Sequence, residues 1–177
     1  ILSTLSGPVG AYNIIIALGF ILTFIAAFLV ASKITRSRFA CTFSALIITF
    51  LPYRLIQSQI HLNLSSTQWL LFVIYFLIIL REKQTAWRVL GLGVFAGLTM
   101  LDNYQYAAFA FLSATVFVLY DLSCRYRLKE MKEFWKNLGW LFVSLVISCV
   151  VILAFDQKIF QSIVRGFNFS NLGPTRD

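Results

Sequence analysis

Six apolar segments, separated by short clusters of lysine and arginine, limit what this chain can fold into more than any other feature of its sequence. The first segment, residues 11–32, carries no charge and reaches the length of about 20 residues that a helix needs to cross a bilayer. Charged residues make up only 12% of the chain, whereas a soluble domain has about 25%. The sequence therefore predicts an integral membrane protein.

The apolar segments lack the alternation of apolar and polar residues that a transmembrane β-strand requires. A segment in the bilayer core must satisfy its backbone hydrogen bonds internally, so each segment is predicted to be a helix. We predict an all-α fold, a polytopic transmembrane helix bundle of about six spans. Residues 1–177 are taken as a single transmembrane domain. Because the chain starts at Ile1 without an initiator methionine, we expect a fragment of a longer membrane protein.

The predicted spans cover residues 11–32, 39–51, 62–80, 89–101, 104–122 and 139–155. The third span is long enough only if its helix begins near Leu62. Pro52 is expected to end the second span, because its ring disfavours continuation of a helix. Residues 125–137 are expected to form a basic, partly amphipathic connector before the last span. The spans are expected to hold no ionisable group deep in the bilayer.

The distribution of lysine and arginine predicts the orientation of the bundle. Eleven of the 15 lie in one set of loops and four in the opposite set, which places the first set in the cytoplasm. The eleven are Lys33, Arg36, Arg38, Arg81, Lys83, Arg88, Arg125, Arg127, Lys129, Lys132 and Lys136. Both ends of the chain are then extracytoplasmic. The net charge of +8 is explained by these loops, and no basic stripe suited to nucleic acid is present.

The stretch from Leu51 to Gln68 holds the only histidine and a dense run of hydrogen-bonding side chains between two apolar segments, and it defines the predicted site on the outer face. An arginine offers a planar fork suited to phosphate, and Asp102 could accept a proton or hold a divalent metal. A divalent metal therefore stays open as a cofactor, although no set of metal ligands stands out. The candidate substrate-binding residues are Tyr53, Arg54, His61, Asn63, Asp102, Tyr104 and Tyr106.

Each of these residues also has a purely structural interpretation. Arg54 could extend to the lipid headgroups, and Asp102 could cap the helix that follows it. Tyrosines collect at membrane interfaces because of their amphipathic shape. His61 fits a neutral, hydrogen-bonded interface histidine as well as a ligand contact. Separately, Gly93 and Gly97 form a GxxxG pattern, which favours close helix packing in lipid over nucleotide binding.

Four short motifs, read in order, resemble the middle region of the bacterial C-type glycosyltransferase superfamily, which includes protein mannosyltransferases and oligosaccharyltransferases. They are a Gly-Pro-x-x-x-Tyr-Asn start, an aromatic-Pro-Tyr-Arg turn, a His-x-Asn stretch and a Tyr-rich break after a Gly-rich span. Here these are Gly7, Pro8, Tyr12 and Asn13, then Pro52, Tyr53 and Arg54, then His61 and Asn63, then Tyr104 and Tyr106.

The resemblance implies a membrane glycosyltransferase in the bacterial plasma membrane, at the cell envelope. Its partners would be membrane lipid and a polyprenyl-phosphate-sugar donor, with transfer on the outer face. The family's catalytic acid lies in an outer loop that would fall upstream of Ile1, so the catalytic residue is unassigned here. A transporter or flippase, or a non-catalytic membrane subunit, remains open as an alternative.

Overall fold

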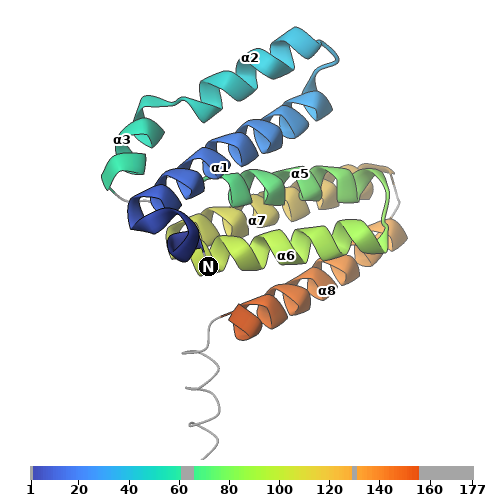
Figure 1. Ribbon diagram of the computed structural model, residues 1–177. Coiled ribbons are helices and arrows are strands. Elements are labelled where there is room, and N and C mark those ends of the chain that lie inside the picture. Colours follow the sequence, from blue (N-terminus) through green and yellow to red (C-terminus); the bar gives the residue numbers. More distant parts are fainter. Residues whose placement is uncertain (1, 61–65, 129–130, 156–177) are drawn as a thin grey trace, which may run out of the picture.

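The computed structural model describes residues 2–60, 66–128 and 131–155. These residues form seven α-helices and contain no strand (Figure 1). The helices are α1 (Leu2–Ile34), α2 (Arg38–Thr49), α3 (Pro52–Ile60), α5 (Gln68–Glu82), α6 (Ala86–Asp102), α7 (Tyr104–Leu128) and α8 (Met131–Phe155). The prediction of an all-helical protein is confirmed for this part of the chain.

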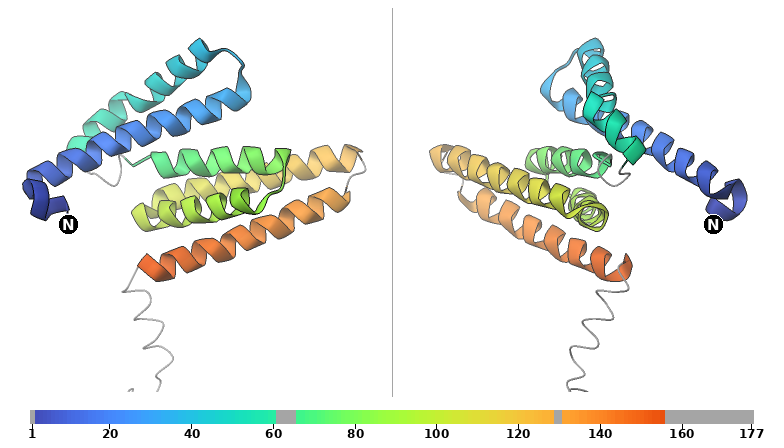
Figure 2. Two further views of the ribbon diagram at one scale, coloured as in Figure 1. Left: turned by 45° about the vertical axis from the view of Figure 1, so that its right-hand side comes forward. Right: turned by 90° about the vertical axis from the view of Figure 1, so that its left-hand side faces the viewer.

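Successive long helices run in opposite directions, so their connections gather at two ends of the bundle (Figures 1 and 2). We call one end the basic end: it holds the connections at residues 34–38, 82–86 and 128–131. We call the other the polar end: it holds α3, the start of α5 and the junction between α6 and α7. The lysine- and arginine-rich segments thus lie together, as expected from the charge count.

The number of spans differs from the prediction. Among the described residues, three helical segments are long and apolar enough to cross a membrane: Val9–Ile34, Tyr104–Cys124 and Met131–Phe155. A fourth is gained if Arg38–Thr49 and Pro52–Ser58, which are bent by 44° relative to each other, act as one span. The structure thus supports a helical membrane protein, but six spans are not confirmed. Helices α5 and α6 have 15 and 17 residues, fewer than the about 20 that a full span needs.

Pro52 lies between two helices, as expected, but it is the first residue of the second helix rather than the end of the first. Helix α2 ends at Thr49, and Pro52 is the first residue of α3, a position where its missing N–H costs nothing. The stretch that the sequence suggested as a polar break therefore contains a nine-residue helix. Helix α3 is amphipathic: Arg54 and Ser58, four residues apart, are both buried, while Tyr53 and Ile56 are exposed.

Two further boundaries correct the sequence prediction. Helix α5 begins at Gln68 rather than near Leu62, and residues 66 and 67 are not helical. The basic connector predicted at residues 125–137 is mostly helical instead, because α7 continues to Leu128 and α8 starts at Met131.

Helix α5 lies at the centre of the bundle, in contact with α1, α6 and α7. Its side chains Val73, Leu77, Ile79 and Leu80 are each at most 3% exposed. The three candidate spans, in contrast, bury only 11–17% of their most apolar windows, as expected for helices that face lipid. Helices α5 and α6 therefore supply most of the buried apolar core.

The GxxxG pattern of α6 packs against α8, as predicted. A Cβ atom on Gly93 would lie 2.7 Å from the backbone oxygen of Ser144, and one on Gly97 would lie 3.1 Å from that of Ser148. Ser144 and Ser148 are also buried, so small residues meet on both helices. Such contacts let backbones approach closely, which is how helices associate where lipid supplies no hydrophobic drive.

A buried polar network at the basic end is the main feature of the core that the sequence did not reveal. Asp121 is 1% exposed and accepts hydrogen bonds from Arg81 Nε at 3.2 Å and from Asn137 Nδ2 at 2.9 Å. Gln84 donates to Asn137 Oδ1. The network joins α5, α7 and α8, and it places an ionised group inside the bundle at the end of the predicted span 104–122.

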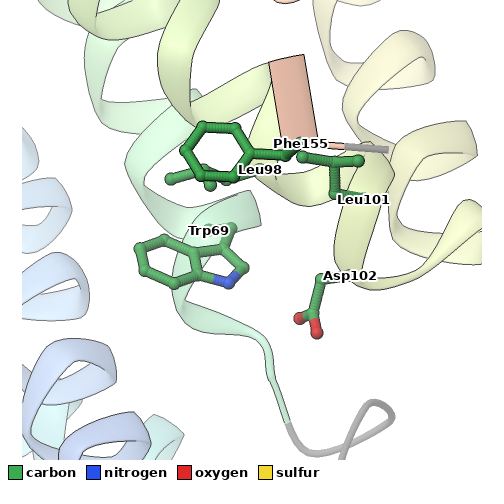
Figure 3. A pocket seen from close by; sticks show the side chains of 5 residues that line it. All are labelled: Trp69, Leu98, Leu101, Asp102 and Phe155. Atoms are coloured by element: carbon green, nitrogen blue, oxygen red, sulfur yellow. The ribbon is translucent and has the colours of Figure 1, made fainter. Parts of the chain in front are cut away.

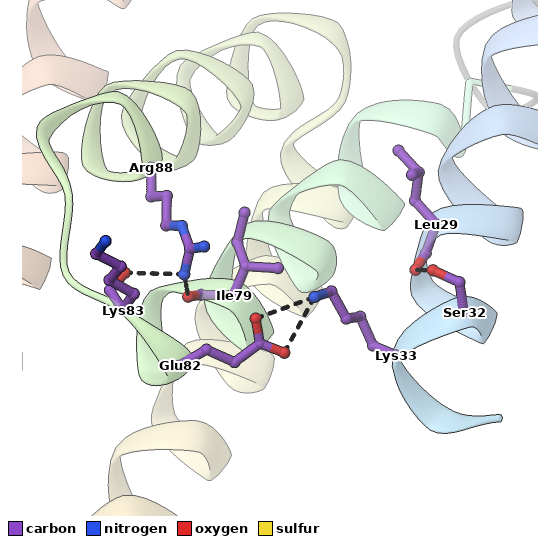
Figure 4. A network of polar contacts seen from close by, with 7 residues as sticks. All are labelled: Leu29, Ser32, Lys33, Ile79, Glu82, Lys83 and Arg88. Carbon is purple, nitrogen blue, oxygen red and sulfur yellow. Dashed lines mark hydrogen bonds and ion pairs between the residues drawn. The ribbon is translucent and has the colours of Figure 1, made fainter. Parts of the chain in front are cut away.

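The end of α5 is also stabilised by polar contacts (Figure 4). Arg88 Nη1 donates to the backbone oxygens of Ile79 and Lys83, which lie in the last turn of α5 and at its C-cap. Lys33 of α1 forms an ion pair with Glu82 at 3.0 Å. Arg88 thus adds a second hydrogen bond to the Ile79 oxygen, which already accepts the N–H of Lys83, and it binds the Lys83 oxygen just beyond the helix. Basic residues at this end, such as Arg88 and Lys33, thus hold helices together in addition to indicating the orientation of the chain in the membrane.

Candidate functional site

Arg54 is the centre of the candidate site at the polar end. It is only 2% exposed, and its guanidinium lies 4.4 Å from the centroid of the Phe20 ring in α1. A cation stacked on an aromatic face is held by the quadrupole of the ring. Arg54 therefore does not extend to the lipid headgroups, because protein encloses its guanidinium group.

Gly19 makes room for Arg54 in the packing of α1 against α3 and α5. A Cβ atom at Gly19 would lie 3.6 Å from Arg54 Nη2 and 3.8 Å from Gln68 Oε1. Gln68 is 5% exposed, and its Oε1 has no hydrogen-bond partner among the described residues. A buried acceptor left unsatisfied costs about 1–3 kcal/mol. The amide oxygen of Gln68 is thus buried at a cost that a ligand or water would offset.

Helix α3 is tied to α1 by a second contact. The hydroxyl of Tyr12 donates to the backbone oxygen of Ser58 at 2.7 Å. Tyr12 belongs to the first of the four motifs and Arg54 to the second, so this bond joins two motif segments. It holds the buried face of α3, and with it Arg54, against α1.

Tyr106 links the arginine to the acid. Its phenol is close enough to interact electrostatically with Tyr53, Arg54 and Asp102, and its side chain is half-buried. These four residues come from α3, the end of α6 and the start of α7. The structure therefore brings together four of the seven predicted site residues.

Asp102 is the last residue of α6, and it does not cap the next helix. Asn103 is the cap: its Oδ1 accepts a hydrogen bond from the backbone N–H of Gln105 at 2.8 Å. Burial raises the pKa of the Asp102 carboxyl from 3.8 to about 6, although a hydrogen bond from the Ser66 hydroxyl opposes this. Asp102 Oδ2 has no hydrogen-bond partner within the described ranges. A carboxylate at the C-terminal end of a helix is also disfavoured by the helix dipole, so this position costs stability.

Asp102 opens into a pocket of about 470 Å³ (Figure 3). The pocket is lined by Trp69, Leu98, Leu101, Asp102 and Phe155. The residues come from α5, α6 and α8, so three helices converge on the pocket at the polar end. The Trp69 ring is itself stacked on Phe95 at a centroid distance of 6.0 Å, which fixes its orientation.

The remaining predicted residues do not join this cluster. Tyr104 is 79% exposed, because residues two apart on a helix do not share a face and Tyr106 is the one that points inward. His61 and Asn63 lie outside the described residues. Trp69, Phe20 and Gln68 are part of the site but were not predicted. Trp69 and Phe20 look like ordinary residues of apolar spans, and Gln68 lies at the edge of the polar stretch 51–68 without standing out in it.

The described residues at the polar end do not fit a divalent metal. No group of three or more His, Cys, Asp or Glu residues is close enough together to hold a metal ion in the part of the chain that the structure describes. Asp102 is the one described carboxylate at this end, and a divalent metal needs more oxygen ligands than it provides. We therefore derive no chemistry through a metal.

The raised pKa of Asp102 predicts that Asp102→Asn stabilises the protein near neutral pH. With the pKa raised from 3.8 to about 6, the folded state loses stability as pH rises through this window, and the full cost is present above about 6. The shift corresponds to about 3 kcal/mol, and we expect about half of this because the carboxyl is only half-buried. Ser66 and Tyr106 are the polar groups that face the carboxyl.

The measurement is thermal unfolding of both proteins at about pH 7.5 and about pH 5. The variant should unfold at the higher temperature at the first pH, and the difference should shrink at the second. A variant that is less stable than the wild type at about pH 7.5 would show that the ionised carboxylate stabilises the fold.

Comparison with known proteins identifies one family. The family described as "Domain of unknown function (DUF6311)" matches residues 3–171. No curated protein and no solved structure matches the chain.

Proposed function

This chain belongs to the DUF6311 family, and from its geometry we propose that it is a membrane glycosyltransferase-like protein that takes a sugar from a polyprenyl-phosphate donor. Arg54 binds the donor phosphate, and Asp102 and Tyr106 contact the polar groups next to it. In this proposal the site faces the outside of the membrane, which the excess of lysine and arginine at the basic end supports.

The observation that carries the proposal is the burial of Arg54 at the polar end, where Tyr106 interacts electrostatically with both Arg54 and Asp102. A guanidinium makes its strongest contacts with carboxylates and phosphates, so the head group of Arg54 suits a phosphate ligand. Asp102 occupies a position that costs stability and does not cap a helix. Residues kept at such a cost commonly serve a binding or catalytic site.

One observation favours a transporter as the second candidate. The ion pair between Asp121 and Arg81 supplies an ionised group within the bundle, which transporters use and which the sequence had not suggested. It lies at the basic end, however, and the residues described between it and Arg54 are mainly the apolar core of α5. Two polar sites separated by a packed core fit a membrane enzyme better than an open transport path.

The test is sugar transfer by the full-length protein reconstituted in liposomes, with a radiolabelled polyprenyl-phosphate-sugar as donor. We expect time-dependent loss of the sugar from the donor. In parallel, the fraction of donor accessible from outside the liposome reports flipping. Flipping without transfer would assign the transporter function instead, and neither activity in a protein that binds the donor would indicate a non-catalytic subunit.

A further inference from the structure

The pocket beside Asp102 has the size and lining of a small-molecule site. Its volume of about 470 Å³ lies within the range of about 300–1,000 Å³ that is typical of ligand pockets. Four of its five lining residues are apolar or aromatic, and the fifth is Asp102. Figure 3 shows the carboxylate and the Trp69 indole bordering the same opening.

We propose that this pocket binds a sugar ring, which stacks on Trp69 and donates hydroxyl hydrogen bonds to Asp102. An indole offers a large, rigid apolar surface that matches the C–H face of a pyranose. An ionised carboxylate only accepts hydrogen bonds, so it suits a ligand rich in hydroxyl donors. Asp102 Oδ2 has no hydrogen-bond partner among the described residues and is therefore available for this contact.

The charges around the pocket distinguish a sugar from other ligands. The Asp102 carboxylate disfavours a phosphate inside the pocket, whereas Arg54 favours one beside it. Tyr106 interacts electrostatically with both Asp102 and Arg54, so both charged groups lie near one phenol. A glycosyl phosphate has the matching order, with hydroxyls at one end and phosphate at the other. A cation would also meet Trp69 and Asp102 favourably, so the test includes a cation as a competing ligand.

This inference names the sugar subsite of the proposed function and rests on it for the identity of the donor. Its test does not require transfer. The probes are methyl glycosides of glucose, mannose, galactose and N-acetylglucosamine, added to the full-length protein in lipid nanodiscs free of sugar detergents. Saturation-transfer NMR measures which ring protons contact the protein and how tightly each glycoside binds.

We expect saturation transfer to the ring C–H protons of at least one glycoside. Trp69→Leu should weaken binding about five- to tenfold, and Asp102→Asn about tenfold. Trp135→Leu is the matched control, because Trp135 is 63% exposed on α8 and lies outside the pocket. This variant should bind the glycosides as tightly as the wild type does. Thermal unfolding checks each variant, and Trp69→Phe, which keeps an aromatic surface, replaces Trp69→Leu if the latter does not fold.

No saturation transfer from any glycoside to folded wild-type protein would overturn the sugar site. Tetramethylammonium that binds in the pocket and displaces the glycosides would assign it to a cation and also overturn it. Different outcomes contradict the glycosyltransferase function and the sugar site. Transfer from the lipid donor without any effect of Trp69→Leu removes the sugar subsite alone, whereas glycoside binding without transfer removes the enzyme alone.

Discussion

Replacing Gly93 with leucine is expected to lower the stability of the bundle more than any other single change considered for its core. Even a Cβ atom at this position would lie 2.6 Å from the Cβ of Ile147 and 2.7 Å from the backbone oxygen of Ser144. A backbone oxygen cannot move aside without shifting α8, so α6 and α8 must separate. Overpacking of this kind costs about 1–3 kcal/mol, and the three further carbons of leucine place the cost at the upper end.

Gly139→Leu is the matched control for Gly93→Leu, because it makes the same chemical change in another helix. A Cβ atom at Gly139 meets nothing within 4 Å, and Gly139 is exposed on α8. A leucine there should be neutral or stabilising, since glycine is the weaker helix former by about 1 kcal/mol. The readout is thermal unfolding in detergent. Equal losses at the two positions would show that α6 and α8 do not pack through Gly93.

Arg54→Lys is expected to weaken donor binding by about ten- to a hundredfold, although it preserves the charge. Lysine cannot make the two parallel hydrogen bonds that a guanidinium makes to phosphate. A charge-assisted contact is worth about 1.5–3 kcal/mol. The measurement is binding of a polyprenyl phosphate to the purified protein, with the unphosphorylated polyprenol as the reference ligand.

Arg38→Lys is the control for Arg54→Lys, because Arg38 is exposed at the basic end. Its replacement should leave the affinity for the donor unchanged. The stacking of Arg54 on Phe20 also contributes to the fold, so thermal unfolding accompanies each binding curve. The loss should be specific to the phosphorylated lipid. An equal loss for polyprenol and polyprenyl phosphate would mean that Arg54 supports the fold and does not contact phosphate.

Much of the candidate site could be predicted because charged and hydroxyl-bearing residues are rare in so apolar a chain. Arg54, Asp102 and Tyr106 stand out from the sequence, and the fold brings them together from α3, α6 and α7. Trp69 and Gln68 could not be singled out in the same way. Their role depends on the position of Gly19 and of the pocket, which only the packing of α1, α5 and α6 reveals.

The packing of α6 illustrates the same limit. The spacing of Gly93 and Gly97 marks one face of α6 for close contact, and this face does contact another helix. The partner face of α8, with Ser144 and Ser148, could not be chosen from the sequence, because an apolar helix has no marked face. The network around Asp121 was missed for a related reason: Asp121 lies in the predicted span 104–122, and the sequence does not show that it meets Arg81 and Asn137 from two other segments.

The number of spans is the largest discrepancy. Hydropathy counts apolar residues, but it does not show where a helix begins. Helix α5 starts only at Gln68, so its 15 residues are too few for it to be counted as a span. It lies at the centre of the bundle, in contact with three other helices. The lengths of α5 and α6 reflect burial within protein, where a helix need not match the thickness of the bilayer.

The most direct measurement of the central claim is photo-crosslinking of a photoactivatable polyprenyl-phosphate-sugar to the full-length protein, followed by mapping of the labelled peptides. We expect labels on α3 and at the start of α5, close to Arg54 and Trp69, and their loss when unlabelled donor is added. Labels spread along the lipid-facing surfaces of α7 and α8, unaffected by unlabelled donor, would contradict it.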